Sequence, residues 1–354
     1  MGRIATILFA HRLGTSLEPE CKMYRLLADI FNDSAMILDC LSPALPKSSR
    51  VLLLSFSSVL RSLCGVAAGS SKASLSAHFA MQGNLGELNA KDSSQETVIS
   101  LLGMLAGSLV VSHISTQWAT WTAMIALLAI HLGTNYLAVR AVSMRTLNRQ
   151  RANLLFSHIL AQAAFTGFLA DNAAPRGLGI LTPDAVSLQE RVFERDGVLR
   201  WKGGGILGYC RLGVDLQTIL NQLDRPHEKT NSRKASLVRL VGLYKDEGYI
   251  LWYDSLKRTY LIVLKHDATT TVQLRAWMHA LYSAKQGIPP ALEAEAFFDH
   301  FQRTLTDIHT IVEKNKLFAR LELAGWDLDI GAMETRSGTR ILLRKEESLV
   351  SQLK

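Results

Sequence analysis

Residues 97–139 decide the fold class of this chain. Thr97–Ile114 reads TVISLLGMLAGSLVVSHI, Ser115–Gln117 reads STQ, and Trp118–Val139 reads WATWTAMIALLAIHLGTNYLAV. Neither long arm contains Asp, Glu, Lys or Arg, and each is close to the roughly 17 to 25 residues that cross a hydrocarbon core. A capping-box pattern at Ser93–Glu96 predicts the start of the first helix. The segment therefore predicts a helical hairpin that spans a membrane.

Aromatic and basic residues lie at the ends of the two arms, as is typical of a membrane hairpin. Trp118 lies beside the link, Tyr136 lies near the far end, and four arginines follow within Arg140–Arg151. Interfacial aromatic residues and the positive-inside rule place both ends of the hairpin toward the cytosol, matrix or stroma. A buried hairpin in a soluble protein is the alternative, because three polar residues interrupt the arms. These are His113, His131 and Asn135.

Two further helices are predicted upstream. Residues 20–45 show the apolar spacing of an amphipathic helix that ends near Pro43. Val51–Gly69 is apolar and predicts a third membrane helix, although Arg61 near its centre opposes insertion by roughly 2.5 to 3.5 kcal/mol. Two glycine pairs have the GxxxG spacing, which predicts close packing between helices of the same chain. They are Gly65 with Gly69 and Gly103 with Gly107.

The chain changes character after residue 170. We divide it into a helical core over residues 1–170, with membrane helices near 51–69, 97–114 and 118–139, a linker over 171–204 and an α+β region over 205–354. The last region has strand patterns at Ile206–Leu212, Tyr249–Tyr253, Tyr260–Lys265 and Arg340–Leu343, and helix patterns at Asp215–Leu223, Thr271–Lys285 and Ala291–Leu323. The predicted fold is mainly α, with a smaller C-terminal α+β domain that resembles the ferredoxin-like split βαβ arrangement.

Composition and motifs exclude several classes of function. The chain has 354 residues, 48% of them hydrophobic and 20% charged, and a net charge of +8, which fits a mixed membrane and soluble architecture. We find no catalytic motif and expect no enzyme, no cofactor and no metal site. The glycines of Gly203–Gly208 match GxGxxG without a following helix, so a turn is expected there. The basic cluster after the hairpin lacks aromatic residues, so no nucleic-acid partner is expected.

Polar residues crowd both ends of the hairpin. Arg145, Asn148 and Arg149 follow helical spacing and are expected on one helix face. A solvated or headgroup-facing surface is one interpretation, and a site for an anionic small molecule is the other. The candidate residues are His78, Gln82, Asn84, Lys91, Asp92, Gln95 and Glu96 before the hairpin, and Asn135, Arg140, Arg145, Asn148 and Arg149 at its end and beyond.

Several long motifs carry a family resemblance. They are Lys22–Asp29 (KMYRLLAD), Phe31–Asp33 (FND), Leu63–Gly69 (LCGVAAG), the stretch from His78 to Thr97, and Arg145–Ala152 (RTLNRQRA). Together they resemble the root UV-B sensitive (RUS) family over roughly the first 170 residues. Gly2–Ala10 is similar to an interior motif of that family, so we expect the usual upstream segment to be missing.

The resemblance implies a membrane protein of an internal organelle, in a family whose plant members are associated with UV-B responses, early seedling development and vitamin B6 homeostasis. It carries no catalytic residues that can be transferred. Two hypotheses follow. In the first, the protein moves or retains a small anionic metabolite such as a B6 vitamer; in the second, it is a membrane-anchored adaptor or scaffold whose C-terminal region binds a protein. The expected partners are a lipid membrane, another RUS-family protein and that metabolite.

Overall fold

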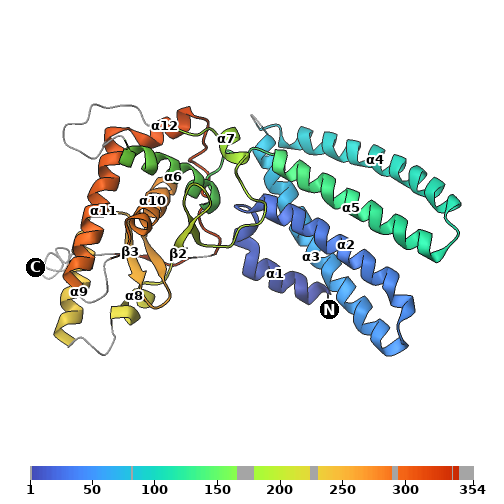
Figure 1. The fold of residues 1–354 in the computed structure, drawn as a ribbon, viewed down its shortest axis with the longest axis horizontal. Helices are drawn as coiled ribbons and strands as arrows, with labels where there is room; N and C mark the ends of the chain where they lie inside the picture. Colours follow the sequence, from blue (N-terminus) through green and yellow to red (C-terminus); the bar gives the residue numbers. More distant parts are fainter. Residues whose placement is uncertain are drawn as a thin grey trace, which may run out of the picture. The chain divides into compact units, whose positions relative to one another are not determined.

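The computed structural model describes residues 2–80, 83–165, 179–223, 230–288, 294–336 and 338–342. The chain divides into two compact units, Met1–Val142 and Ser143–Lys354. The first unit is helical, and the second combines helices with a mixed sheet (Figure 1). The predicted fold class, mainly α with a smaller C-terminal α+β domain, is confirmed.

The helical unit is organised around α2 and α3. These two helices pack along each other, α1 packs against α3, and α2 also contacts α5. A small core forms where they meet, from Leu17, Tyr24, Ala28 and Ala67. The helices are α1 (Gly2–Leu17), α2 (Cys21–Leu41), α3 (Lys47–Phe79), α4 (Leu85–His113) and α5 (Gln117–Ala141), with a short 3-10 turn at Ser42–Ala44.

Three helices of this unit are long and apolar enough to cross a membrane, namely α3, α4 and α5. No residue of α4 is buried, and Val139 is the buried residue of α5. Their apolar side chains therefore face outward, which suggests membrane association because water is a poor solvent for so much exposed apolar surface. The two predicted arms of the hairpin are helices, and Thr116 caps the second by accepting a hydrogen bond from the Ala119 amide.

Two expectations about these helices are wrong. Helix α4 begins at Leu85 rather than after Ser93, and the Ser93 carbonyl accepts a hydrogen bond from the Thr97 hydroxyl (2.9 Å) inside the helix. The GxxxG glycines do not pack against other helices of the described chain. A Cβ atom at any of them would meet nothing within 4 Å, which holds for Gly65, Gly69, Gly103 and Gly107.

The second unit is built on a mixed sheet in the order β1-β2-β4-β3, with β5 paired to β4. Strands β2 and β4 are neighbours and run parallel, and β3 runs antiparallel to β4. This sheet differs from the expected ferredoxin-like arrangement, in which a strand antiparallel to both separates the two parallel strands of the split βαβ unit. The elements are α6 (Arg149–Phe165), α7 (Pro183–Ser187), β1 (Val198–Arg200), β2 (Ile206–Leu212), α8 (Leu216–Leu223), α9 (Thr230–Leu243), β3 (Tyr249–Asp254), β4 (Thr259–Lys265), α10 (Thr270–Gln286), α11 (Ala294–Lys314), α12 (Leu317–Leu323) and β5 (Arg340–Ile341).

Three features of this unit differ from the sequence interpretation. Helix α6, which we grouped with the N-terminal core, packs on α10, and Asn153 on it accepts a hydrogen bond from the Trp277 indole (2.9 Å). The edge strand β1 lies in the segment expected to be a linker. The helix expected over 291–323 is two helices, because Lys316 adopts a left-handed backbone conformation (φ 46°) between α11 and α12.

A buried ion pair fastens the start of α6 to the loop that follows α7. Arg151 Nε donates to Glu190 Oε1 (2.8 Å), and these side chains are 2% and 4% exposed. A second guanidinium nitrogen of Arg151 donates to the Thr146 hydroxyl (2.9 Å). Loss of one member of such a pair leaves the other charge buried without compensation.

We therefore expect Arg151→Met to lower the free energy of unfolding of the second unit by about 3–5 kcal/mol. Arg239→Met is the matched control, because Arg239 pairs with Asp299 at the surface (3.4 Å), where such pairs contribute less than about 1 kcal/mol. Denaturant unfolding followed by tryptophan fluorescence, to which the buried Trp277 contributes, measures both. Equal losses in the two variants would contradict the structural role of the Arg151–Glu190 pair.

Candidate functional site

The polar residues expected before the hairpin lie at the end of α3 and in the first half of α4. The structure adds Lys72, whose ammonium group contacts both Asp92 and Glu96 at 2.8 Å. Lys91 pairs instead with Glu87 on its own helix (2.6 Å). These groups are exposed and satisfy one another, which is the arrangement of a solvated face. His78 lies in the last turn of α3, Asn84 precedes α4, Gln95 is exposed on α4, and Gln82 lies outside the described residues.

The residues expected at the end of the hairpin and beyond it divide between the two units. Asn135 and Arg140 belong to α5, and the Arg140 guanidinium lies 5.8 Å from the centre of the Tyr136 ring. The single helix face expected for Arg145, Asn148 and Arg149 is wrong, because α6 begins only at Arg149. Arg145 is exposed in the segment between α5 and α6, whereas Asn148 is buried and accepts a hydrogen bond from the Arg151 amide (2.9 Å).

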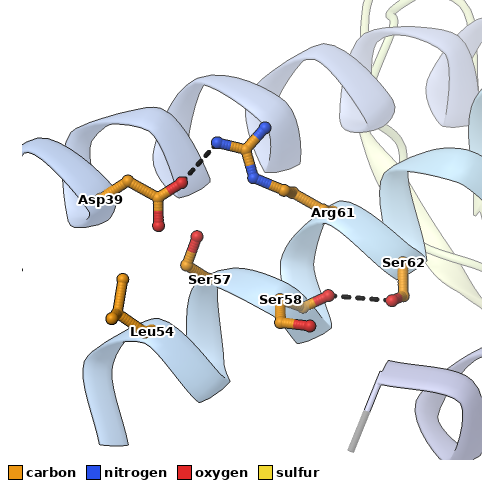
Figure 2. Close-up of a pocket in the computed structure, with 6 residues that line it drawn as sticks. All are labelled: Asp39, Leu54, Ser57, Ser58, Arg61 and Ser62. Carbon is orange, nitrogen blue, oxygen red and sulfur yellow. Dashed lines mark hydrogen bonds and ion pairs between the residues drawn. The ribbon is translucent and has the colours of Figure 1, made fainter. Parts of the chain in front are cut away.

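A first pocket, of about 400 Å³, lies between α2 and α3 (Figure 2). Arg61 donates to Asp39 across it (2.5 Å), which explains how α3 carries a charge near its centre. The Ser57 and Ser62 hydroxyls donate to backbone carbonyls (3.2 and 2.8 Å). The two charges of this pocket cancel, and two of its hydroxyls are already bonded, so it offers little attraction to an anion.

A second pocket, of about 730 Å³ in the C-terminal unit, has the opposite character. We call it the basic pocket. Five cationic side chains and two carboxylates line it, which leaves an excess of three positive charges, and its volume is in the range of small-molecule sites. The charged lining residues are Arg149, Arg195, Asp196, Arg211, Asp215, Lys257 and Arg336.

The sheet brings these residues together from distant parts of the sequence. Arg195 and Asp196 precede β1, Arg211 lies on β2, and Lys257 lies in the turn before β4, which pairs with β2. The approach of the first segment to β2 requires a glycine. Gly197 has φ +75°, and a Cβ atom on it would stand 2.6 Å from the Cys210 carbonyl oxygen.

Asp196 organises the inner part of the basic pocket. Its carboxylate bonds to the buried Arg149 guanidinium, accepts a hydrogen bond from the Thr335 hydroxyl (3.3 Å) and lies 3.9 Å from a guanidinium nitrogen of Arg336. Arg149 Nε also donates to the Met333 carbonyl (2.8 Å). The guanidinium of Arg149 is thus fixed and largely neutralised, and we assign it a positioning role.

Other cations of the pocket remain available. Arg195 stacks on the Tyr209 ring (4.8 Å to its centre) and donates to the Tyr209 hydroxyl (3.0 Å), which leaves part of its donor fork open. Arg211 and Lys257 are exposed, and no described residue pairs with the charged group of either. Guanidinium and ammonium groups without counter-ions, beside threonine hydroxyls, are the donors that bind phosphate and carboxylate.

The thiol of the basic pocket is not placed to act as a nucleophile. This thiol, that of Cys210, is fully buried, and burial raises the pKa of Cys210 far above the ordinary value. A thiol that stays protonated at neutral pH is a poor nucleophile. Of the basic-pocket residues, sequence reasoning identified only Arg149. The others are scattered single charges that only the fold brings together, in part through the pairing of β2 with both β1 and β4.

Comparisons with known proteins agree with the resemblance. A family model described as "Vitamin B6 photo-protection and homoeostasis domain" matches residues 1–163, a range that includes Arg149. The chain is 29% identical to Protein root UVB sensitive 3 of Arabidopsis thaliana over 86% of its own length and 65% of the relative. It is 39% identical to RUS family member 1 of Dictyostelium discoideum over 45% of its length and 31% of the relative.

A third relative, Protein root UVB sensitive 2, chloroplastic, of Arabidopsis thaliana, is 24% identical over 78% of this chain and 56% of the relative. The chain thus spans less than two thirds of the length of these three relatives. No solved structure matches it. The family model and the named relatives agree with the motifs between residues 22 and 152, and residues 1–163 of the chain match the root UV-B sensitive (RUS) family.

Proposed function

We propose that this chain is an integral membrane protein of vitamin B6 homeostasis that moves or retains a phosphorylated B6 vitamer. The basic pocket carries the proposal, because Arg211 and Lys257 present charges that the described residues do not neutralise. A phosphate monoester has a charge near −2 at neutral pH, which matches the two positive charges of Arg211 and Lys257. The choice of vitamin B6 as the ligand class comes from the description of the matching family model, which names this vitamin.

The membrane part of the proposal rests on α3, α4 and α5. Each is long and apolar enough to span a bilayer, and α4 has no buried residue. We propose that these helices are inserted in an internal organelle membrane, a location supported by the word "chloroplastic" in the name of one relative.

Alkaline carbonate extraction tests the insertion. Carbonate releases peripheral proteins, whereas apolar helices buried in lipid stay with the membrane because their transfer to water is unfavourable. We expect the full-length chain to remain in the pellet. Its release into the supernatant would contradict insertion and would favour the soluble helical hairpin.

Ligand binding tests the basic pocket. Pyridoxamine 5′-phosphate is the sharper probe, because it lacks the aldehyde through which pyridoxal phosphate reacts with surface lysines. We expect the purified chain to bind it, and Arg211→Gln to raise the dissociation constant about tenfold through loss of one charge-assisted contact. Isothermal titration calorimetry measures the binding.

Arg303→Gln is the matched control, since Arg303 is exposed on α11 and does not line the pocket. It should bind like the parent, and unphosphorylated pyridoxamine should bind much more weakly than its phosphate. Equal affinity for the phosphorylated and unphosphorylated forms, or equal effects of the two variants, would contradict the assignment of the pocket to a phosphate.

An adaptor is the alternative function, with another RUS-family protein as the partner. The second unit exposes large apolar side chains that a protein partner can cover. They lie on different elements, namely Leu188, Val238, Leu256 and Leu323. Vesicles that contain the full-length chain distinguish the hypotheses, because a transporter takes up labelled pyridoxamine 5′-phosphate and loses this uptake in Arg211→Gln, whereas an adaptor shows no uptake in either form.

A further inference from the structure

Two carboxylates of α2 lie inside the helical unit. Asp29 and Asp33 are one helical turn apart and are 7% and 6% exposed. Arg25 Nη1 donates to Asp29 Oδ1 (3.1 Å), and His131 Nδ1 lies 3.1 Å from Asp33 Oδ2. His131 belongs to α5, one of the candidate membrane helices. Ionisable side chains in such helices are costly and are associated with ion and proton pathways.

Each of these carboxylates has a second oxygen without a partner. Asp29 Oδ2 and Asp33 Oδ1 are buried, and no described residue forms a hydrogen bond with either. A buried anionic oxygen in this situation is unfavourable. Burial accordingly raises the pKa of Asp29, with a further contribution from the charge of Asp33, while Arg25 and His131 oppose the shift.

The charges around these oxygens do not balance. On α2, Arg25 supplies one positive charge against the two carboxylates. On α3, the ionisable groups in reach are Cys64 and Arg61, and Arg61 is bonded to Asp39. On α5, the facing group is His131. The cluster is therefore short of one positive charge when His131 is neutral, and it is balanced when one proton is bound.

We propose that Asp29, Asp33 and His131 form a proton-binding site within the helical unit, which holds one exchangeable proton. The proton comes from water and adds to the imidazole or to an open carboxylate oxygen, so no other reactant takes part. No described group of three His, Cys, Asp or Glu side chains can hold a metal ion, which favours a proton over a divalent cation. This proposal does not depend on ligand binding in the basic pocket, which belongs to the other unit.

Proton binding makes the stability of the helical unit depend on pH with a defined sign. If the folded unit binds one proton more than the unfolded chain, its stability falls as the pH rises through the range where that proton leaves. A carboxyl group whose pKa is raised in the folded state changes the stability in the same direction. Its stabilising contribution is complete at low pH and is lost as the pH rises. The melting temperature of the helical unit should therefore increase as the pH falls toward the raised pKa of Asp29, and it is compared at about pH 8 and about pH 5.

The experiment uses the full-length chain in phosphatidylcholine nanodiscs. A fluorogenic maleimide reports unfolding, in a background of Cys40→Ser and Cys210→Ala, so that the signal comes from the buried Cys21 and the half-buried Cys64 of the helical unit. We expect the increase between the two pH values to shrink by about 3 °C or more in Asp33→Asn. In Asp33→Asn the charges of the cluster are already balanced without a bound proton, because Arg25 then faces a single carboxylate.

Asp39→Asn is the matched control, with the same substitution on the same helix at a carboxylate that pairs with Arg61 outside the cluster. It should keep the pH dependence of the parent, and His131→Gln should weaken it. The same pH dependence in Asp33→Asn and the parent would overturn the proposal. So would stabilisation of the parent by Na⁺ relative to choline at about pH 8 that is absent in Asp33→Asn, because the site would then hold a monovalent cation.

Discussion

The apolar surface of α4 and α5 sets the constraint on which the helical unit depends. No residue of α4 is buried by the described chain, and an ionisable side chain beside such exposed apolar helices is costly unless it has a partner. Helix α2 provides these partners. Asp39 pairs with Arg61 of α3, and Asp33 contacts His131 of α5. The same helix thus makes both candidate spans compatible with their ionisable side chains, and through its buried oxygens it also creates the imbalance from which the proton site follows.

The sequence predicted those elements whose pattern is local. The apolar arms became α4 and α5, and the alternating residues of Ile206–Leu212 became β2 with the same bounds. It failed where tertiary contacts decide. Helix α6 has the helical pattern of the N-terminal region, but its buried side chains pack against the C-terminal sheet and α10. The glycine pairs indicated close helix packing, yet spacing alone does not say whether a neighbouring helix is present, and the described chain has none there.

The candidate site was predictable only in part for the same reason. Arg149 stood out because it follows an apolar arm within a dense group of arginines. Its partner Asp196 lies beyond the expected helical core and has no local pattern, so only the fold places the two together. The cluster of Asp29, Asp33 and His131 was equally difficult to predict, because the spacing of Asp29 and Asp33 is typical of the polar side of an amphipathic helix. Their burial depends on α3 and α5, which both pack against α2.

The position of α6 has a consequence for how this family can evolve by gain and loss of segments. The family match ends at residue 163, inside α6, whose side chains Leu155, Phe156, Ile159 and Leu160 are at most 1% exposed within the core of the second unit. A gene fusion or splice variant that ended at this boundary would leave four large apolar side chains without their core, each worth about 1.5–3 kcal/mol of burial. The matched region is thus a unit of sequence similarity, whereas the unit of folding extends across its end.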